Sequence, residues 1–379
     1  MRRSTIRART GGLRRDERGV SLLVTALVLA VLLGMAALAI DVGLLMAART
    51  EAQRAADAAA LAGAGSLWEV PGDEDRARTR AMLYGGRNLI RNDPTVIAEG
   101  DVDVDLSELK VTVRVHRTGE RGNPIPTIFA RVLNIDAVDV SADAAAKAEP
   151  AGQANCLLPV ALADNWVNVD GDPGYDPGEG DVYVPCPDPG CTGYLFPRDF
   201  GTSLQLKPAQ GNKVDDDADQ GGWFDAGWWY LWQPGERGAS ELKDYVTGCP
   251  DPSRTFAVGE PITDKNGNTQ SIVNEFERLI ANDPGAAWDP GCGTFGCVDG
   301  SAFEVSPRIR TVVLFDPDTY VKVGAGSNFL VSNFVGVFVE RVDTGPPGQR
   351  GVWVRLVPAP GVGDGPGGGG FLRRPVLVE

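Results

Sequence analysis

The chain has 379 residues, enough for two or three domains, and a net charge of −15. Its 51 acidic and 36 basic side chains argue against nucleic acid as a partner, because phosphates would be repelled by an acidic surface. With one histidine and no phosphate-binding loop or nucleophile motif, the sequence predicts a protein that is not an enzyme.

The first predicted element is a membrane-spanning helix. Residues 1–18 form a basic leader with seven arginines, and residues 19–41 then carry no charge until Asp41. An apolar run of about 20 residues is long enough to cross a bilayer. Because basic flanks stay in the cytoplasm, we predict a single-pass protein of the cytoplasmic membrane, with a cytoplasmic N-terminus and its bulk outside. The alternative is a secretory signal cleaved within residues 46–52, although its apolar core would be unusually long.

An alanine-rich helix is predicted to continue outward from the span and to stop at Gly63 or Gly65, because alanine has the highest helix propensity and glycine often ends helices. Small side chains let another helix approach closely, so we predict that this surface packs against similar helices of partner proteins. The alternative is a solvated alanine helix. The predicted packing residues are Ala48, Ala52, Ala55, Asp57 and Ala59.

A small α+β module is predicted over residues 42–150. Acidic residues at the start of its second helix suit the helix dipole, and valines that alternate with polar residues predict strands. We expect helices at 73–89 and 124–133, and strands at 102–106, 111–115 and 137–146.

The N-terminal part of the chain resembles the TadE/TadG-like Flp pilus-assembly proteins. Their shared pattern is Arg-Gly, an apolar span, Asp-x-Gly at its exit and Gln-x-Ala-x-Asp-Ala-Ala, and residues 111–150 resemble the strand–helix–strand segment of the family. The matching positions are Arg18, Gly19, Asp41, Gly43, Gln53, Ala55, Asp57, Ala58 and Ala59. The resemblance implies a membrane-anchored structural or assembly component of a Flp (tight adherence) pilus or a related secretion apparatus. It also implies other pilus-assembly membrane proteins as partners, contacted through the N-terminal helix.

One feature departs from the family pattern. Relatives that are processed by prepilin peptidase carry a glutamate a few residues after the cleaved glycine, and residues 20–24 hold no acidic side chain after Gly19. We therefore expect a permanently anchored TadG-like protein rather than a processed pilin subunit.

A change of composition marks the outer part of the chain. Residues 149–153 are predicted to form a linker, followed by a mostly β extracytoplasmic domain at 151–360 with one helix at 271–281. The glycine-rich residues 361–379 are predicted to be a flexible tail. The expected fold class is therefore α+β: a transmembrane helix that continues into a long helix, a small α+β module, and a mostly β outer domain with disulfides.

All six cysteines lie in the outer domain, in a compartment predicted to be oxidising, so disulfides are expected. Two local pairs plus a Cys156–Cys249 pair is one of several possible connectivities. The alternative is a four-cysteine zinc site built from the two C-x4-C pairs. The cysteines are Cys156, Cys186, Cys191, Cys249, Cys292 and Cys297.

A loop at 170–181 is the candidate metal site, because it gathers carboxylates among glycines and prolines. Calcium prefers oxygen ligands from flexible loops of this kind, and a solvated acidic turn is the alternative. No other cofactor is expected. The candidate ligands are Asp170, Asp172, Asp176, Glu179 and Asp181. A second acidic cluster at 215–219 is a weaker candidate.

An aromatic run at 223–232 is predicted to belong to the domain core, since large aromatic side chains usually bury their area. If it were exposed, it could contact glycan or protein, and the chain would then be an anchored envelope binding module. The oligomeric state does not follow from the sequence.

Overall fold

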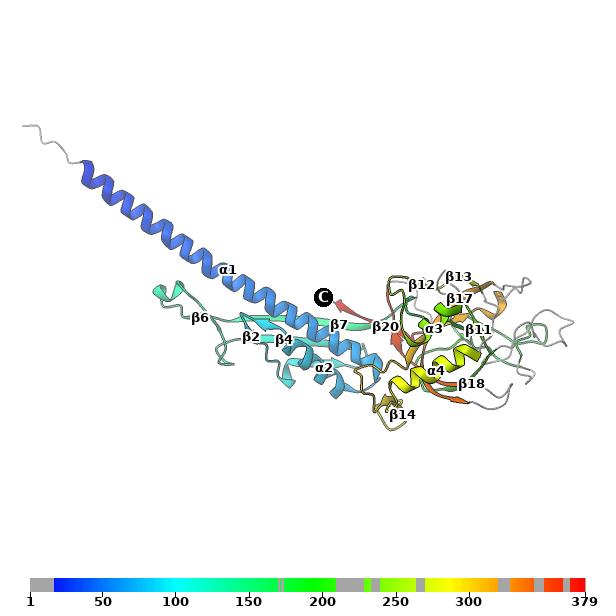
Figure 1. Ribbon diagram of the computed structural model, residues 1–379. Coiled ribbons are helices and arrows are strands. Elements are labelled where there is room, and N and C mark those ends of the chain that lie inside the picture. Colours follow the sequence, from blue (N-terminus) through cyan, green and yellow to red (C-terminus); the bar gives the residue numbers. More distant parts are fainter. Residues whose placement is uncertain are drawn as a thin grey trace, which may run out of the picture.

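The computed structural model describes residues 17–169, 171, 174–208, 228–232, 239–263, 270–319, 328–343, 351–363 and 369–378. A long N-terminal helix, α1 (Glu17–Glu69), projects from a β-rich body, and the C-terminal part of the helix belongs to that body (Figure 1). The structure confirms the expected α+β class, with a long apolar helix followed by a β-rich region that contains disulfides.

The helix α1 passes through both glycines at which it was predicted to stop. At Gly63 an added Cβ would lie 2.9 Å from Val111 Cγ1 and 3.2 Å from Ala81 Cβ. The glycine therefore allows neighbouring elements to approach the helix closely, and this packing stabilises the helix beyond Gly65.

A second helix, α2 (Glu74–Gly86), lies against α1 and begins as the sequence indicated. The side chain of its N-cap residue, Asp73, accepts a hydrogen bond of 2.9 Å from the Arg76 amide. Its buried face is formed by Ala77, Ala81 and Gly85, small residues that let the two helix backbones lie close together.

A five-stranded sheet completes this membrane-proximal module. Its order is β19-β20-β7-β4-β3, antiparallel except for the β19–β20 pair. Along β4, Val111, Val113 and Val115 are fully buried beneath α1, and the intervening residues face outward, as their period of two predicts. The strands are β3 (Val102–Asp105), β4 (Lys110–Arg117), β7 (Val140–Pro150), β19 (Ala359–Pro360) and β20 (Leu372–Val378).

The predicted helix at 124–133 is wrong over most of its length. Strand β5 (Ile125–Pro126) pairs with β6 (Ala137–Val138), and only the short 3₁₀ helix η2 (Ala130–Leu133) follows. Pro126 disfavours the helical conformation at the residue before it, Ile125, and this residue is extended in β5.

Two predicted boundaries are also corrected. The segment predicted as a linker at 149–153 continues strand β7 to Pro150 and then forms β8 (Gln153–Ala154), which pairs with β12 (Phe256–Ala257). The segment predicted as a flexible tail contains β20, because Phe371 and Leu372 are buried and the strand pairs with β7.

The outer domain is built on a seven-stranded sheet of order β13-β17-β16-β9-β11-β10-β18. An additional pairing of β17 with β18 closes six of these strands into a ring. The β9–β16 and β10–β11 pairs are parallel, and the others are antiparallel. The strands are β9 (Val160–Ala163), β10 (Ser203–Pro208), β11 (Trp228–Leu231), β13 (Pro261–Thr263), β16 (Ile309–Phe315), β17 (Asn328–Asp343) and β18 (Gly351–Val357).

Two helices, α3 (Ala239–Thr247) and α4 (Gln270–Asn282), pack on one side of this sheet. The helix predicted at 271–281 is confirmed as α4, whereas α3 was not predicted. Phe276 and Leu279 of α4 share a buried cluster with Val160, while the next residue along β9, Ala161, belongs to a second cluster on the opposite face.

Short elements join the outer domain to the membrane-proximal module. The Thr294 amide donates a hydrogen bond to Pro71 O, and the Tyr84 hydroxyl donates to the Glu304 carboxylate at 2.6 Å. The Glu304 carboxylate also forms an ion pair with Arg80. The remaining short elements are β1 (Leu89–Ile90), β2 (Asp93–Pro94), η1 (Glu99–Asp101), β14 (Ala287–Asp289), β15 (Cys297–Asp299) and η3 (Pro317–Thr319). The chain itself also passes between the two parts after β7 and again before β19.

The six cysteines form three disulfides, so the alternative of a four-cysteine zinc site is wrong. The thiols of both C-x4-C pairs are bonded to each other within each pair. The disulfides are Cys156–Cys249, Cys186–Cys191 and Cys292–Cys297.

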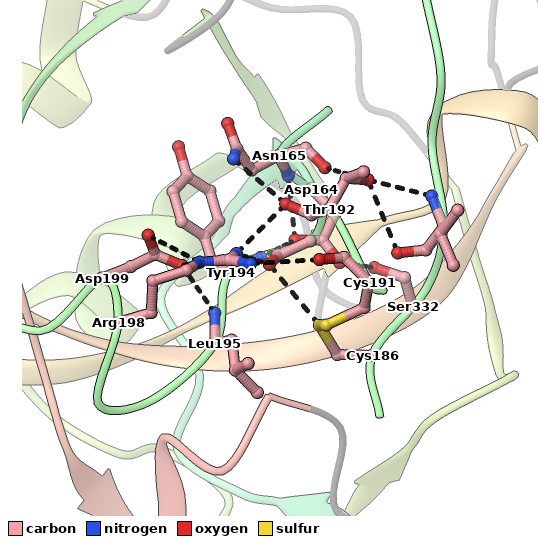
Figure 2. The surroundings of a disulfide bond; sticks show 12 residues. Asp164, Asn165, Cys186, Cys191, Thr192, Tyr194, Leu195, Arg198, Asp199 and Ser332 are labelled. Atoms are coloured by element: carbon pink, nitrogen blue, oxygen red, sulfur yellow. Dashed lines mark hydrogen bonds and ion pairs between the residues drawn. A yellow bond between two sulfur atoms is a disulfide. The ribbon is translucent and has the colours of Figure 1, made fainter. Parts of the chain in front are cut away.

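Close to the Cys186–Cys191 disulfide, a buried carboxylate joins loop segments to strand β17 (Figure 2). Asp164 accepts hydrogen bonds from the amides of Tyr194 and Asn165 at 2.8 and 2.9 Å, and from the hydroxyls of Tyr183 and Ser332. Burial raises the pKa of Asp164 from 3.8 to about 6, and these hydrogen bonds only partly oppose the shift.

This raised pKa predicts a pH dependence of folding. Between pH 6 and pH 4 the folded chain binds a proton at Asp164 that the unfolded chain does not, so this residue adds stability as the pH falls, by up to about 3 kcal/mol. In urea unfolding, the free energy of unfolding of Asp164→Asn should not show this increase between pH 6 and pH 4, whereas that of the native chain should. The same substitution at the exposed Asp188 should keep it, and an unchanged pH slope in Asp164→Asn would contradict the assignment.

Candidate membrane-anchoring site

In the described part of the chain, one helix is long and apolar enough to cross a membrane: α1, over its N-terminal half. In the described structure the apolar segment is not buried inside the body, and its leucines and valines, Leu27 and Leu33 for example, are more than half exposed. Outside a membrane such a surface would be costly in water, at about 25 cal/mol per Å² of apolar area. The segment therefore has the length, composition and exposure of a membrane anchor.

Asp41, which ends the uncharged run, is buried although it carries a charge. Its carboxylate accepts three backbone hydrogen bonds, from the amides of Ile128, Phe129 and Ala130, at 2.8, 2.9 and 2.6 Å. These amides lie at the start of the 3₁₀ helix η2, where backbone donors have no partner within the helix. Asp41 thus fixes the outer end of the apolar segment to the loop of residues 127–135.

The sequence identified Asp41 as the end of the uncharged run and as part of a family pattern, and it did not reveal the contact of Asp41 with residues 128–130. The contact joins residues that are 87 to 89 positions apart. The one available signal was the apolar character of the segment 128–135, which was attributed to a helix instead.

The alanines that were predicted to contact partner helices are covered by the chain itself. All four have no exposed surface, and they belong to one buried cluster with residues of α2, β4 and β7. The small residues therefore allow the module to fold onto its own helix, and they do not form a surface for partners. These alanines are Ala48, Ala52, Ala55 and Ala59.

The fifth predicted packing residue, Asp57, is half-buried. Its carboxylate accepts a 2.8 Å hydrogen bond from the Gln53 amide, which also donates to Asp143 O on β7 at 3.0 Å. The family motif Gln-x-Ala-x-Asp thus fastens α1 to the sheet of its own module. The alternative cleavage region at 46–52 is part of the same helix, and its Ala48 and Ala52 are fully buried.

This packing predicts the effect of a larger residue at the helix crossing. At Gly85 of α2, an added Cβ would lie only 3.0 Å from Ala59 Cβ, so the site has no room for a leucine. Ala59→Leu should lower the free energy of unfolding by about 1–3 kcal/mol and leave the chain in the membrane. Thermal unfolding in detergent would measure the loss of stability, and Thr50→Leu at an exposed position of α1 is the control. Equal stability of the two variants would contradict the prediction.

The predicted calcium loop is only partly described, since Asp170 and Asp172 lie outside the described residues, as does the acidic cluster at 215–219. Asp181 is buried and accepts from the amides of Val169 and Asp176. Asp176 in turn accepts from the amides of Gly178 and Glu179. Among the described residues, no three acidic, histidine or cysteine side chains are grouped to hold a metal. Calcium binding stays a prediction.

Much of the aromatic run, residues 223–227, also lies outside the described residues. Residues 228–231 form β11, and Trp232 is 1 % exposed and donates from its indole nitrogen to Leu158 O at 3.1 Å. Trp232 thus belongs to the core of the outer domain.

Comparisons with known proteins concern the anchoring segment. No curated protein and no solved structure matches the chain. One family model does match, and it is described as "Putative Flp pilus-assembly TadE/G-like". It covers residues 19–66, which include the apolar segment, Asp41 and the buried alanines. The match confirms that the chain resembles the TadE/TadG-like family over these residues.

Proposed function

We propose that this protein is a membrane-anchored structural component that assembles or anchors a Flp-type pilus or a related secretion apparatus. The match of residues 19–66 to a Flp pilus-assembly family is the observation that carries the proposal. The exposed apolar half of α1 supports the anchoring role. The basic leader supports an orientation with the N-terminus in the cytoplasm and the body outside.

The structure suggests how such an anchor would act. The helix α1 runs without a break from the apolar segment into the core of the module, and the module is bound to the outer domain through Glu304 and through the hydrogen bond from Thr294 to Pro71. A load or a partner on the outer domain would therefore act directly on the membrane segment. Because the alanines of α1 are buried, partner membrane proteins would contact the helix within the span, at residues 21–40.

Deletion of the gene in the source cell, followed by complementation, tests this function. We expect the deletion to abolish or reduce Flp filaments, and the full chain to restore them. A chain in which residues 1–40 are replaced by a cleavable secretion signal would export the same body without an anchor, and it should fail to restore filaments. Normal filaments in the deletion strain would refute the proposal, and full rescue by the unanchored body would refute the anchoring role.

Carbonate extraction of membranes, protease treatment of intact cells and an intact mass would test the topology. We expect a full-length chain that resists carbonate and whose body is accessible from outside. A mass that begins at Val20 would mean processing by prepilin peptidase, and a released chain that begins near residues 48–51 would mean a secreted protein.

A further inference from the structure

The loop at 127–135 is the part of the body that lies furthest along the apolar segment of α1. Phe129, Val132 and Leu133 line a pocket of about 220 Å³ together with Gly34 and Leu38 of α1. These helix residues precede Asp41, on the side of the apolar run. In Figure 1 the chain around β6 extends beside α1, away from the rest of the body.

The surface of this loop is apolar and open. Five of the eight residues from 128 to 135 are large apolar residues that are 42–88 % exposed, and only Arg131 and Asn134 of these eight have polar side chains. Scattered apolar residues are common on protein surfaces, but a contiguous group of this kind marks a contact with another apolar phase. The five residues are Ile128, Phe129, Val132, Leu133 and Ile135.

The backbone of the loop is suited to a medium that offers no hydrogen bonds. Asp41 accepts from three of its amides, and the amides of Val132, Asn134 and Ile135 donate to carbonyls of the same loop. The Thr127 hydroxyl donates to Ile135 O, and its amide donates to Asp136 O. Unpaired backbone groups would cost several kcal/mol each in hydrocarbon, and these pairings avoid that cost.

We propose that the loop at 127–135 inserts into the outer leaflet of the same bilayer that α1 spans, so that the protein is held at two points instead of one. The inference rests on the proposed membrane anchor. If the bilayer core of about 30 Å covers residues 19–40, then Gly34 lies about 10 Å inside the level of Asp41. The loop residues that line a pocket together with Gly34 and Leu38 must lie at a similar depth.

Lipid is the occupant that this position selects. The loop surface is continuous with the apolar surface of α1, which is exposed along the span, so any medium that surrounds the helix at residues 34–38 also surrounds the loop. Arg131 is exposed on the loop, and its long side chain would extend its charge to the lipid phosphates while the aliphatic part stays among apolar groups. Asp41 positions the loop for this contact.

Spin-label depth measurements on the full chain in phosphatidylcholine–phosphatidylglycerol vesicles would test the insertion. All six native cysteines are in disulfides, so one introduced cysteine gives one labelled site. We would label Val132→Cys in the loop, Leu27→Cys in the span and Leu83→Cys on α2, all exposed positions. Contact of each label with oxygen, which concentrates in hydrocarbon, is compared with its contact with a water-soluble nickel complex.

We expect the label at 132 to resemble the label at 27, with oxygen contact high and nickel contact low, and the label at 83 to show the reverse. A water-exposed label at 132 with a lipid-exposed label at 27 would overturn the insertion and leave the anchor intact. A label at 132 that is shielded from both reagents would also overturn it, because protein would then cover the loop. A water-exposed label at 27 would refute the membrane anchor itself, and with it the insertion.

The role of Asp41 has its own test in the same vesicles. Asp41→Ala removes the acceptor of three amides, so the label at 132 should become more mobile and gain contact with the nickel complex, while the label at 27 stays in hydrocarbon. An unchanged label at 132 in this variant would show that Asp41 does not position the loop.

Discussion

Removal of residues 370–379 is expected to lower the free energy of unfolding by about 5 kcal/mol or more, or to prevent folding of the membrane-proximal module. This change deletes strand β20, and with it the side chains of Phe371 and Leu372, which are 0 % and 2 % exposed. Loss of a buried phenylalanine costs about 3–5 kcal/mol and of a buried leucine about 2–5 kcal/mol, and the hydrogen bonds to β7 are lost as well. Chemical unfolding of the full chain in detergent would measure the difference.

A matched pair of substitutions separates the two contributions to this loss of stability, side-chain burial and strand pairing. Leu372→Ala and Leu377→Ala make the same chemical change in β20, but Leu372 is buried and Leu377 is 45 % exposed. We expect the first to cost about 2–5 kcal/mol and the second less than about 1 kcal/mol. Near-native stability of the truncated chain would mean that the C-terminal segment is the flexible tail that its glycines suggested.

Loss of the Cys156–Cys249 disulfide should have the second large effect. It joins residues 93 positions apart, so it restricts the unfolded chain far more than the two disulfides that join residues 5 positions apart. Chain-entropy reasoning gives about 4–5 kcal/mol for the long loop and about 2 kcal/mol for a short one. Cys156→Ala with Cys249→Ala should therefore lower the midpoint of urea unfolding more than Cys292→Ala with Cys297→Ala.

Non-reducing conditions are needed for this comparison, since a reductant would open all three disulfides at once. If the variant without the short loop were the less stable one, native contacts around Cys292 and Cys297 would outweigh the restriction of the unfolded chain.

The sequence predicted those elements whose signals are local. Val111, Val113 and Val115 alternate with polar residues and form a strand with one buried face, and Phe276 and Leu279 lie on the buried side of the predicted helix α4. The apolar span is likewise a local signal, and it was identified from composition alone.

Structural features that depend on partners far away in the sequence were not predicted. The sequence around Leu372 shows glycines and prolines, and nothing in it indicates that β7 is its neighbour. The alanines of α1 suit a partner helix and the chain's own α2 equally well, so composition could not decide between them. The contact of Asp41 with Ile128 depends on the folded module that brings them together.

The position of β20 has a consequence for biosynthesis. The sheet of the membrane-proximal module receives its strand next to β7 from the far end of the chain, so this N-terminal module cannot be completed while the ribosome is still translating the outer domain. During export, β7 remains an unpaired edge close to the membrane surface, and such edges promote aggregation. Completion of the module therefore reports that the outer domain has been made and translocated, and translation products that stop before β20 retain an open edge that quality-control proteases can recognise.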